Sequence, residues 1–436
     1  MWRSVNASCG VDRVRAIAIA GVLVAGAGSV AALAQPATQT PRPGPVQAVP
    51  YEPVVLRVDA DKQEWTLNAE VMLVSLTEQR SDVRGRQPVF QTRRIVVDKA
   101  VLVFPVPTDT AFTVMDDLLF ESSVILGGRT ISDAPRLVEG YQAGARLAAW
   151  DISNIDANGI RLNVRTAMTS FNTVVDEKRA FAVDWPKGEL PEMLNSALGA
   201  QLYVESDAPE IARLVEVWTN GNPKRVKPYY LAKHLATKVV DWYQPSEGPF
   251  LAERDSEIYR TGTGAIMIAG YNVRGAIAAA REQRGSAFDM ANLLCAVYRQ
   301  AGIPARVVIG YNHEGQQRGS NRSPIHAWVE FFLMVDEENG LGEWIPVDII
   351  RQREFASRAP AVERPWKYFG NNDRSHQYSA ISFHWHPPTV VVNSGPPAFW
   401  GWLPEPSAPN IDQGIRFHAF NTPMTTEIQR RRREGR

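Results

Sequence analysis

The stretch REQRGSAFDMANLLCAVYRQAGIPARVVIGYNHEG, residues 281–315, decides the fold of the second half of this chain. After Ser286, apolar residues return every three or four positions, which is the spacing of one helix face. This face contains Phe288, Ala291, Leu294, Cys295 and Tyr298. Gly302 is a typical helix end, and the run at 305–311 that follows it has the composition of a strand. We therefore expect a helix that leads directly into a strand.

Further helices and strands are expected on both sides of this unit. Asp207 is expected to cap one helix, and a second helix is expected over 228–242. Strand-like runs occupy 326–334 and 343–349, and residues 369–388 are expected to complete the same sheet. A helix packed on an antiparallel sheet is an α+β arrangement.

The first half of the chain has a different period. Apolar and polar residues alternate there, for example around Trp65 and Leu67 and again around Ile160 and Leu162. Alternation with a period of two is typical of half-buried antiparallel strands. We therefore predict an antiparallel β-sandwich over 54–184, with no cluster of chemically reactive residues in it.

The N-terminus resembles a targeting segment. Basic residues precede an apolar run over 16–31, and the sequence ALA at 32–34 follows as a cleavage signal. This pattern predicts a signal peptide over 1–34, followed by a Pro-rich linker over 35–53. The protein is therefore expected to be periplasmic or secreted. After cleavage no stable membrane span is expected, whereas an uncleaved segment would anchor the chain to the membrane.

Composition excludes several classes of function. The chain contains 47 basic and 47 acidic residues, whereas a protein that binds nucleic acid normally has a basic excess. Cys295 is the only cysteine after the signal peptide, so the mature protein cannot form an internal disulfide. The stretch GTGAIMIAG at 262–270 lacks the Lys of a phosphate-binding loop. His384 and His386 form at most a metal pair without a third ligand. No cofactor and no metal are therefore expected.

Three blocks after the predicted helix carry a family resemblance. They are GIPARVVIGY at 302–311, HAWVEFFL at 326–333 and WIPVD at 344–348. Together they resemble the core of the transglutaminase-like superfamily, whose fold is similar to that of papain-type cysteine proteases. The resemblance covers about residues 190–375 and implies a papain-like helix-plus-antiparallel-sheet domain.

A C-terminal extension over 376–436 would follow that domain. Its Pro-rich segment near 395–410 is expected to be irregular. The alternating region over 54–184 would suit the β-sandwich that is often found ahead of such cores.

The resemblance also implies a catalytic triad. In this family a Cys at the start of the helix is the nucleophile, a His on the next strand activates it, and an Asp on the following strand orients the His. HAWVE supplies His326 and WIPVD supplies Asp348. Counted back along the family's pattern, the nucleophile lies fifteen residues before Gly302, where this chain has Ala287. Asp289 follows two residues later, as in the family, so the reacting sulfur itself is absent.

Two nearby side chains, Cys295 and Ser286, are candidates to replace the missing thiol as nucleophile. Cys295 lies ~12 Å further along the helix axis on the apolar face, so it is expected in the core. Ser286 is expected to cap the helix by accepting a backbone N–H from Asp289, and its use as a nucleophile is the alternative.

Trp328 and Glu330 alternate with His326 on one strand and therefore share its face. We predict that they line the same cleft as binding residues, together with Ser286 and Asp289. A solvated position is the alternative for Glu330.

Three functions follow from these residues. The first is an exported transglutaminase-like protein, catalytically degenerate at Ala287, that binds a peptide, protein or glycan in the former active-site cleft. The second is an active amide-hydrolysing or acyl-transfer enzyme that uses Ser286 or a water activated by His326. The third is a structural envelope protein whose β-sandwich mediates association. The sequence favours the first function and hence a protein without enzymatic activity.

Overall fold

The computed structural model describes residues 52–75, 77–80, 89–92, 94–116, 120–131, 134–142, 145–246, 256–260, 266–314, 324–386, 396–406 and 411–421. Contacts divide the chain into the units 1–51 and 52–436, and all described residues belong to the second unit. The predicted signal peptide, and the predicted linker up to residue 51, lie outside the described residues. The predicted domain boundaries within the second unit stay predictions.

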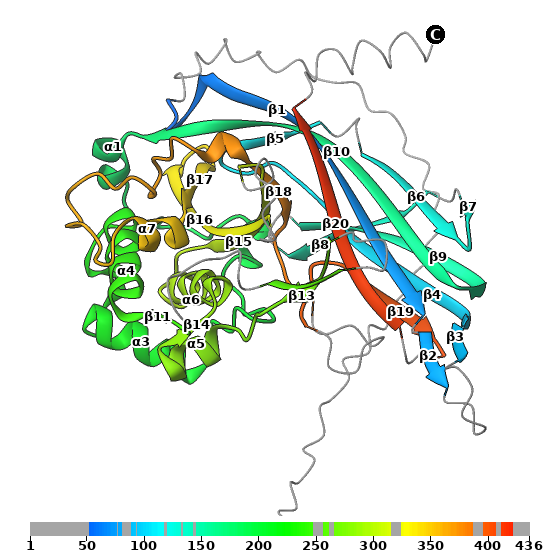
Figure 1. The fold of residues 1–436 in the computed structure, drawn as a ribbon. Coiled ribbons are helices and arrows are strands. Elements are labelled where there is room, and N and C mark those ends of the chain that lie inside the picture. Colours follow the sequence, from blue (N-terminus) through cyan, green and yellow to red (C-terminus); the bar gives the residue numbers. More distant parts are fainter. Residues whose placement is uncertain are drawn as a thin grey trace, which may run out of the picture. The chain divides into compact units, whose positions relative to one another are not determined.

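The largest sheet has eight antiparallel strands in the order β12-β13-β20-β1-β10-β6-β7, with β5 beside β10 (Figure 1). The strands are β1 (Val55–Ser75), β5 (Thr113–Met115), β6 (Glu121–Leu126), β7 (Arg129–Ile131), β10 (Gly159–Val175), β12 (Ser256–Arg260), β13 (Ile266–Tyr271) and β20 (Ile411–Asn421). Leu67 and Val71 on β1 are buried, whereas Asn68 and Glu70 between them are only half-buried. This is the alternation that the sequence predicts for one face in the core.

A four-stranded antiparallel sheet, β19-β4-β9-β8, shares the core of the eight-stranded sheet. Its strands are β4 (Ile95–Val106), β8 (Arg136–Gln142), β9 (Ala145–Ala157) and β19 (Gly401–Glu405). Leu102 on β4 and Trp150 on β9 belong to the same buried cluster as Leu67 and Ile160 of the large sheet. The two sheets form the predicted antiparallel β-sandwich. A short hairpin, β2 (Thr77–Arg80) and β3 (Val89–Thr92), accompanies them.

The second half of the chain contains the helices and a separate four-stranded sheet, β17-β16-β15-β18. Its strands are β15 (Ala305–Asn312), β16 (Ile325–Asp336), β17 (Leu341–Val347) and β18 (Tyr378–Ser382). β18 pairs with β15, so residues 369–388 complete this sheet as the sequence predicts. The sequence placed the third strand over 343–349, but β17 ends at Val347 because the Asp348 side chain caps the next helix.

Helices cover this smaller sheet, as Figure 1 shows. They are α1 (Glu177–Ala182), α2 (Glu192–Asn195), α3 (Pro209–Thr219), α4 (Pro228–Trp242), α5 (Ala276–Glu282), α6 (Ala287–Gln300) and α7 (Ile349–Phe355), with 3₁₀ turns at Pro223–Arg225 and Ser375–Gln377. A two-residue parallel pair joins β11 (Gln244–Pro245) to β14 (Arg284–Gly285). The prediction that Asp207 caps a helix is wrong. Helix α3 starts with Pro209, so Ala208 is its N-cap, and no side chain forms a cap hydrogen bond there.

Helix α6 is the centre of the second half. It contacts β15 and β16 on the sheet and the helices α3, α4, α5 and α7. Every residue from Ala287 to Arg299 is buried, so over this range no face of the helix is exposed to solvent. Even Arg299 is satisfied internally, since it donates to the carbonyl oxygens of Ala305 and Gly199 at 2.8 and 2.7 Å.

The last part of the chain adds a strand to each of the three main sheets. β18 joins the smaller sheet, β19 pairs with β4, and β20 lies between β1 and β13. The expectation of irregular structure near 395–410 is therefore wrong for β19. Pro404 is compatible with a strand there because β19 is an edge strand, where a proline need not donate to the ladder.

Specific side chains link the sandwich to the smaller sheet. The Glu343 carboxylate on β17 accepts the backbone N–H groups of Val54 and Val55 at 2.9 and 2.6 Å. Ser170 on β10 donates to the carbonyl oxygen of Tyr378 on β18 at 2.6 Å. The position of the site on β15, β16 and β18 is therefore fixed from the sandwich side as well as from the helices.

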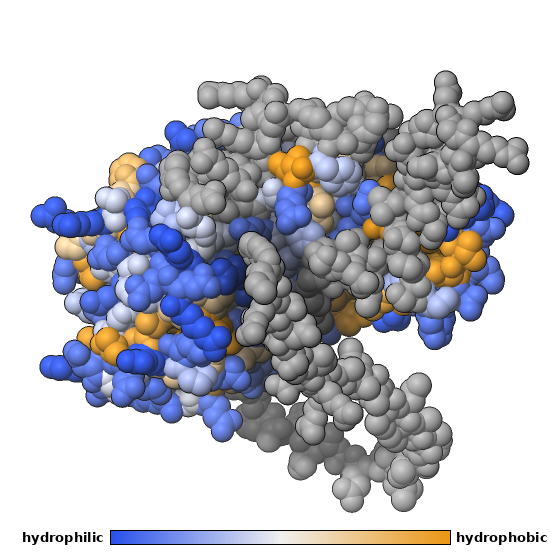
Figure 2. Space-filling model, turned by 60° about the horizontal axis from the view of Figure 1, so that its bottom comes forward, coloured by the Kyte–Doolittle hydropathy of each residue, from blue (hydrophilic) through white to orange (hydrophobic). Residues whose placement is uncertain are grey.

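The surface drawn in Figure 2 is mostly hydrophilic over the described residues, with small scattered hydrophobic patches. Within the described ranges, no helix combines the length and the apolar composition that a membrane crossing requires.

Candidate active site

The start of α6 is held by a capping box. Ser286 Oγ accepts the backbone N–H of Asp289 at 3.0 Å, and Asp289 Oδ2 accepts the backbone N–H of Ser286 at 3.4 Å. Asp289 Oδ1 also accepts the N–H groups of Arg274 and Gly275, both at 2.8 Å. The cap that the sequence predicts at Ser286 is confirmed. Its hydroxyl is oriented along the helix start, with Asp289 as its donor.

Ala287 is the first residue of α6 and is buried. Backbone N–H groups at a helix start and the helix dipole favour an anionic group at this point. A thiolate here would be stabilised, but the methyl group of Ala287 has no lone pair and no proton to give. Burial raises the pKa of the neighbouring Asp289 above its usual value, and its bonds from Gly275 and Arg274 oppose that rise.

His326 on β16 and Asp348 at the start of α7 form a buried pair. His326 Nε2 lies 2.9 Å from Asp348 Oδ1 and 3.0 Å from Oδ2, and the two side chains are 4% and 6% exposed. Asp348 Oδ1 also accepts the backbone N–H of Arg351 at 3.0 Å, because Asp348 caps α7. The carboxylate is thus fixed by the helix it caps, and it orients the imidazole. Since Nε2 is engaged, Nδ1 is the ring nitrogen that remains for a proton transfer or a ligand.

Tyr378 completes the surroundings of this histidine. Its ring stacks on His326 with centroids 5.0 Å apart and an interplanar angle of 19°. Arg351 Nε donates to the Tyr378 hydroxyl at 3.0 Å, and burial raises the pKa of that hydroxyl. The sequence did not single out Tyr378 or Arg351. The only sequence signal for Arg351 is its position three residues after Asp348, the spacing of a helix cap. Tyr378 reaches His326 because β18 pairs with β15.

The geometry agrees with the comparison to known families. A model of the transglutaminase-like superfamily matches residues 263–349. This segment contains α6, β15, β16, β17, His326 and Asp348. The chain contains a transglutaminase-like core.

Several solved structures resemble the chain at low sequence identity. One is a candidate cysteine protease from Cytophaga hutchinsonii, with 12% identity, a TM-score of 0.46, and 84% of this chain and 92% of that chain covered. A second is the periplasmic domain of TgpA from Pseudomonas aeruginosa, with 15% identity, a TM-score of 0.24, and 70% and 98% covered. A third is a candidate protease from Parabacteroides distasonis, with 12% identity, a TM-score of 0.21, and 78% and 65% covered. No curated protein matches the chain.

Cys295 lies in the interior of the transglutaminase-like core. It is fully buried on α6, and burial raises the pKa of its thiol, so the neutral, unreactive form is favoured. It is the only cysteine among the described residues. The structure thus places Cys295 where the sequence predicts a core residue.

The two predicted binding residues on β16 are buried within the protein. Glu330 is fully buried and forms an ion pair with Arg306 at 2.7 Å. Its other oxygen accepts the N–H of Ala111 at 3.0 Å and that of the Trp328 indole at 3.2 Å. Arg306 in turn lies 4.2 Å from the centroid of Trp344. Through Ala111, Glu330 thus links the transglutaminase-like core to the loop before β5. A ligand role for Glu330 and Trp328 stays a prediction.

Three further histidines, His313, His384 and His386, have partners other than Asp348. His384 Nε2 and His386 Nε2 are 3.3 Å apart, but no group of three or more possible metal ligands occurs among the described residues. His313 stacks on Trp65 of the sandwich with centroids 3.6 Å apart, and its Nε2 lies 2.6 Å from Ser379 Oγ. Burial lowers the pKa of His313 to about 3, so this ring is neutral at ordinary pH.

Proposed function

We propose that this chain is an exported transglutaminase-like protein that has lost its catalytic thiol and binds a peptide, protein or glycan segment in the former active-site cleft. The observation that carries the proposal is the combination of Ala287 at the start of α6 with an intact His326–Asp348 pair. The base and its orienting carboxylate are retained, whereas the atom that would form the acyl-enzyme is missing.

The chemistry of the retained groups supports binding rather than turnover. Acyl transfer through a covalent intermediate needs a nucleophile within reach of the base, and Ala287 supplies none. An imidazole fixed through Nε2 keeps Nδ1 as a single, well-oriented hydrogen-bonding atom. With the Nε2 hydrogen directed at Asp348, an unprotonated Nδ1 accepts, and peptides and glycans both offer N–H or O–H groups that can donate to it.

The second candidate is an active enzyme with Ser286 or a water as nucleophile. The Ser286 hydroxyl accepts the N–H of Asp289 in the capping box, which fixes its oxygen at the start of α6. A water activated by His326 needs no nucleophilic side chain, so His326 is the residue whose removal separates the two candidates. A structural envelope role is the third candidate and predicts that changes at His326 have no effect on ligand binding.

The test uses fluorescein-labelled casein as a peptide probe and dansylcadaverine as an amine probe. We expect the wild-type chain to bind casein, measured by fluorescence anisotropy, without cleaving it and without linking dansylcadaverine to it. His326→Ala should weaken the binding. Lys62→Ala, an exposed change on β1, is the matched control and should leave it unchanged.

Each other result contradicts the proposal in a different way. Cleavage or amine transfer that His326→Ala abolishes would establish the active enzyme. Binding that is absent, or that is equal in the wild type and His326→Ala, would exclude the cleft as the binding site.

A further inference from the structure

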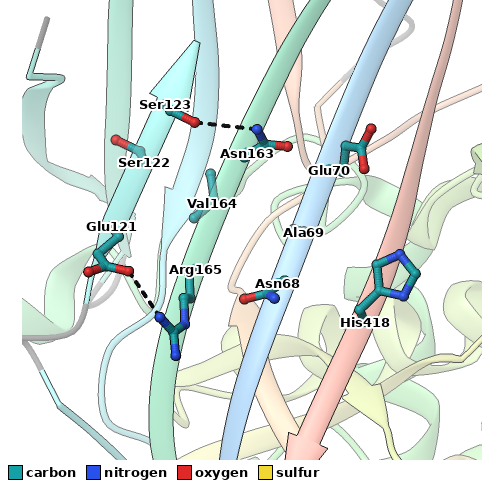
Figure 3. A pocket seen from close by; sticks show the side chains of 10 residues that line it. All are labelled: Asn68, Ala69, Glu70, Glu121, Ser122, Ser123, Asn163, Val164, Arg165 and His418. Carbon is teal, nitrogen blue, oxygen red and sulfur yellow. Dashed lines mark hydrogen bonds and ion pairs between the residues drawn. The ribbon is translucent and has the colours of Figure 1, made fainter. Parts of the chain in front are cut away.

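The outer face of the eight-stranded sheet contains a polar groove that lies apart from the His326–Asp348 pair. It has a volume of about 460 Å³ and is lined by side chains from the four neighbouring strands β6, β10, β1 and β20 (Figure 3). These strands belong to the sandwich, in which the sequence pointed to no reactive cluster. None of the residues that line the groove belongs to the candidate active site at Ala287, His326 and Asp348.

Strand register arranges the lining residues in two rows across the sheet. Glu121, Arg165, Asn68 and His418 are successive cross-strand neighbours and form the first row. Ser123, Asn163 and Glu70 form the second row in the same way, and Arg416 follows Glu70 on β20 outside the lining residues. Since neighbouring strands lie about 4.8 Å apart, each row presents a polar group at that interval. A ligand with hydroxyl groups repeated along its length fits such a ladder.

The charged groups of the groove are paired with one another. Arg165 Nη1 lies 3.4 Å from Glu121 Oε2, and Figure 3 shows this pair along one side of the groove. Glu70 is flanked by Arg161 at 3.0 Å and Arg416 at 2.6 Å. Each of these three guanidinium groups therefore already lies against a carboxylate. A polyanion would have to compete with Glu70 and Glu121 for them, so a neutral ligand is favoured.

The uncharged groups of the groove have hydrogen-bonding capacity to spare. Asn163 Nδ2 donates to Ser123 Oγ at 3.3 Å, which leaves the second amide hydrogen and the amide oxygen of Asn163 outside that bond. Asn68 Oδ1 has no hydrogen-bond partner in the described part of the chain. Asn68 lines the groove, so a ligand hydroxyl held there can satisfy this acceptor.

An aromatic side chain lies beyond the first row along β20, outside the residues that line the groove. Phe420 follows His418 by two residues on β20 and so shares its face, and it is 52% exposed. The C–H face of a pyranose ring packs on such a ring while its hydroxyl groups bond to polar side chains. An aromatic platform beside paired amides and carboxylates suits a sugar better than it suits an apolar ligand.

We propose that this groove is a binding site for an uncharged oligosaccharide. Asn68, Asn163 and Arg165 supply the hydrogen bonds, and Phe420 supplies the stacking surface. The site is separate from the cleft at Ala287, so it can hold a glycan chain whether or not the cleft binds anything.

The experiment measures binding by calorimetry, with the full chain and three uncharged probes: maltohexaose, cellohexaose and chitohexaose. We expect saturable binding of at least one of them. Asn68→Leu removes the amide and keeps the side-chain size, and it should weaken binding about tenfold. His418→Ala changes an exposed residue of the groove lining and should also weaken the binding. This second variant keeps the test valid if Asn68→Leu fails to fold. Lys62→Ala is the matched control, since it is exposed on the same strand about 20 Å away and should bind as the wild type does.

Two results would overturn the proposal. One is the absence of binding to all three hexasaccharides. The other is binding that neither Asn68→Leu nor His418→Ala weakens, because the sugar would then occupy a different surface.

Discussion

At the scale of single residues, the side chain of Ala287 ends in a methyl group at a helix start built to favour an anion. The capping box of Ser286 and Asp289 is complete, and the His326–Asp348 pair is buried and aligned. In the function proposed above, a difference of one side chain separates this core from a thiol enzyme. The position at residue 287 rests on the resemblance of the sequence blocks and stays a prediction.

The buried pair of Glu330 and Arg306 gives a first prediction. Arg306→Met would leave the Glu330 carboxylate fully buried beside Ala111 and Trp328 without its cation. Breaking a buried ion pair in this way is expected to lower the free energy of unfolding by about 3–5 kcal/mol. Urea denaturation at neutral pH measures the change.

The double variant Arg306→Met, Glu330→Gln is the control for this prediction. It removes the uncompensated charge and should recover part of the lost stability. An unchanged denaturation midpoint in Arg306→Met would mean that Glu330 is stabilised without its partner.

At the scale of elements, the sequence predicted the helix and the strands of the core well and their ends less well. Periodicity located α4 and α6 and the strands β15 and β16, because long amphipathic or apolar runs carry a strong signal. Caps were harder: Ser286 was recognised, whereas Asp207 was mistaken for the cap that the backbone places at Ala208. The N-cap of α3 is set by Pro209, and the N-cap of α7 is set by the end of β17 at Val347. Local composition does not predict either position.

The α6 cap gives a second prediction. Ser286→Ala removes the acceptor of the Asp289 N–H and is expected to cost about 1 kcal/mol of stability. Ser286→Thr keeps a hydroxyl at the cap and should cost less. Both values are measured by thermal or urea unfolding. If Ser286→Ala abolished a measurable enzymatic activity while Ser286→Thr kept it, the serine would be a nucleophile and not only a cap.

At the scale of the whole described unit, the sheets depend on segments far apart in sequence. β20 lies between β1 and β13, and β18 completes the sheet that carries His326. The sequence predicted that residues 369–388 join the smaller sheet, but no local pattern predicts their partner strand or the place of β20. The contacts of Tyr378 with His326 and with the Arg351 side chain were missed because they arise only when β18 lies beside β15. The backbone contact of Arg351 with Asp348 is local and belongs to the α7 cap.

The contact between the sandwich and the core gives a third prediction, on pH. His313 packs on Trp65, and burial lowers its pKa to about 3 from an ordinary value of 6.5. Below pH 6.5 the unfolded chain takes up a proton that the folded chain refuses until about pH 3, so stability falls as the pH falls through this range. One such group contributes up to ~1.4 kcal/mol per pH unit.

His313→Phe keeps an aromatic ring against Trp65 and removes the titration. Its free energy of unfolding should therefore fall less steeply between pH 6.5 and 3 than that of the wild type. His418→Gln, at an exposed position, should keep the wild-type slope. Equal slopes for the wild type and His313→Phe would show that His313 does not titrate differently in the folded and unfolded states.

The most direct test of the central claim is the reactivity of a thiol placed at residue 287. In Ala287→Cys, alkylation by iodoacetamide is followed as a function of pH, and the labelled residue is identified by peptide mapping. The start of α6 and His326 should lower the pKa of this thiol below the usual ~8.5, so that labelling at 287 stays fast below pH 7. Ala291→Cys, one turn along the same helix, should label slowly, and His326→Gln should remove the effect at 287. A thiol at 287 that reacts with an ordinary or raised pKa, or that His326→Gln leaves unchanged, would contradict the claim that only the reacting atom of this site has been lost.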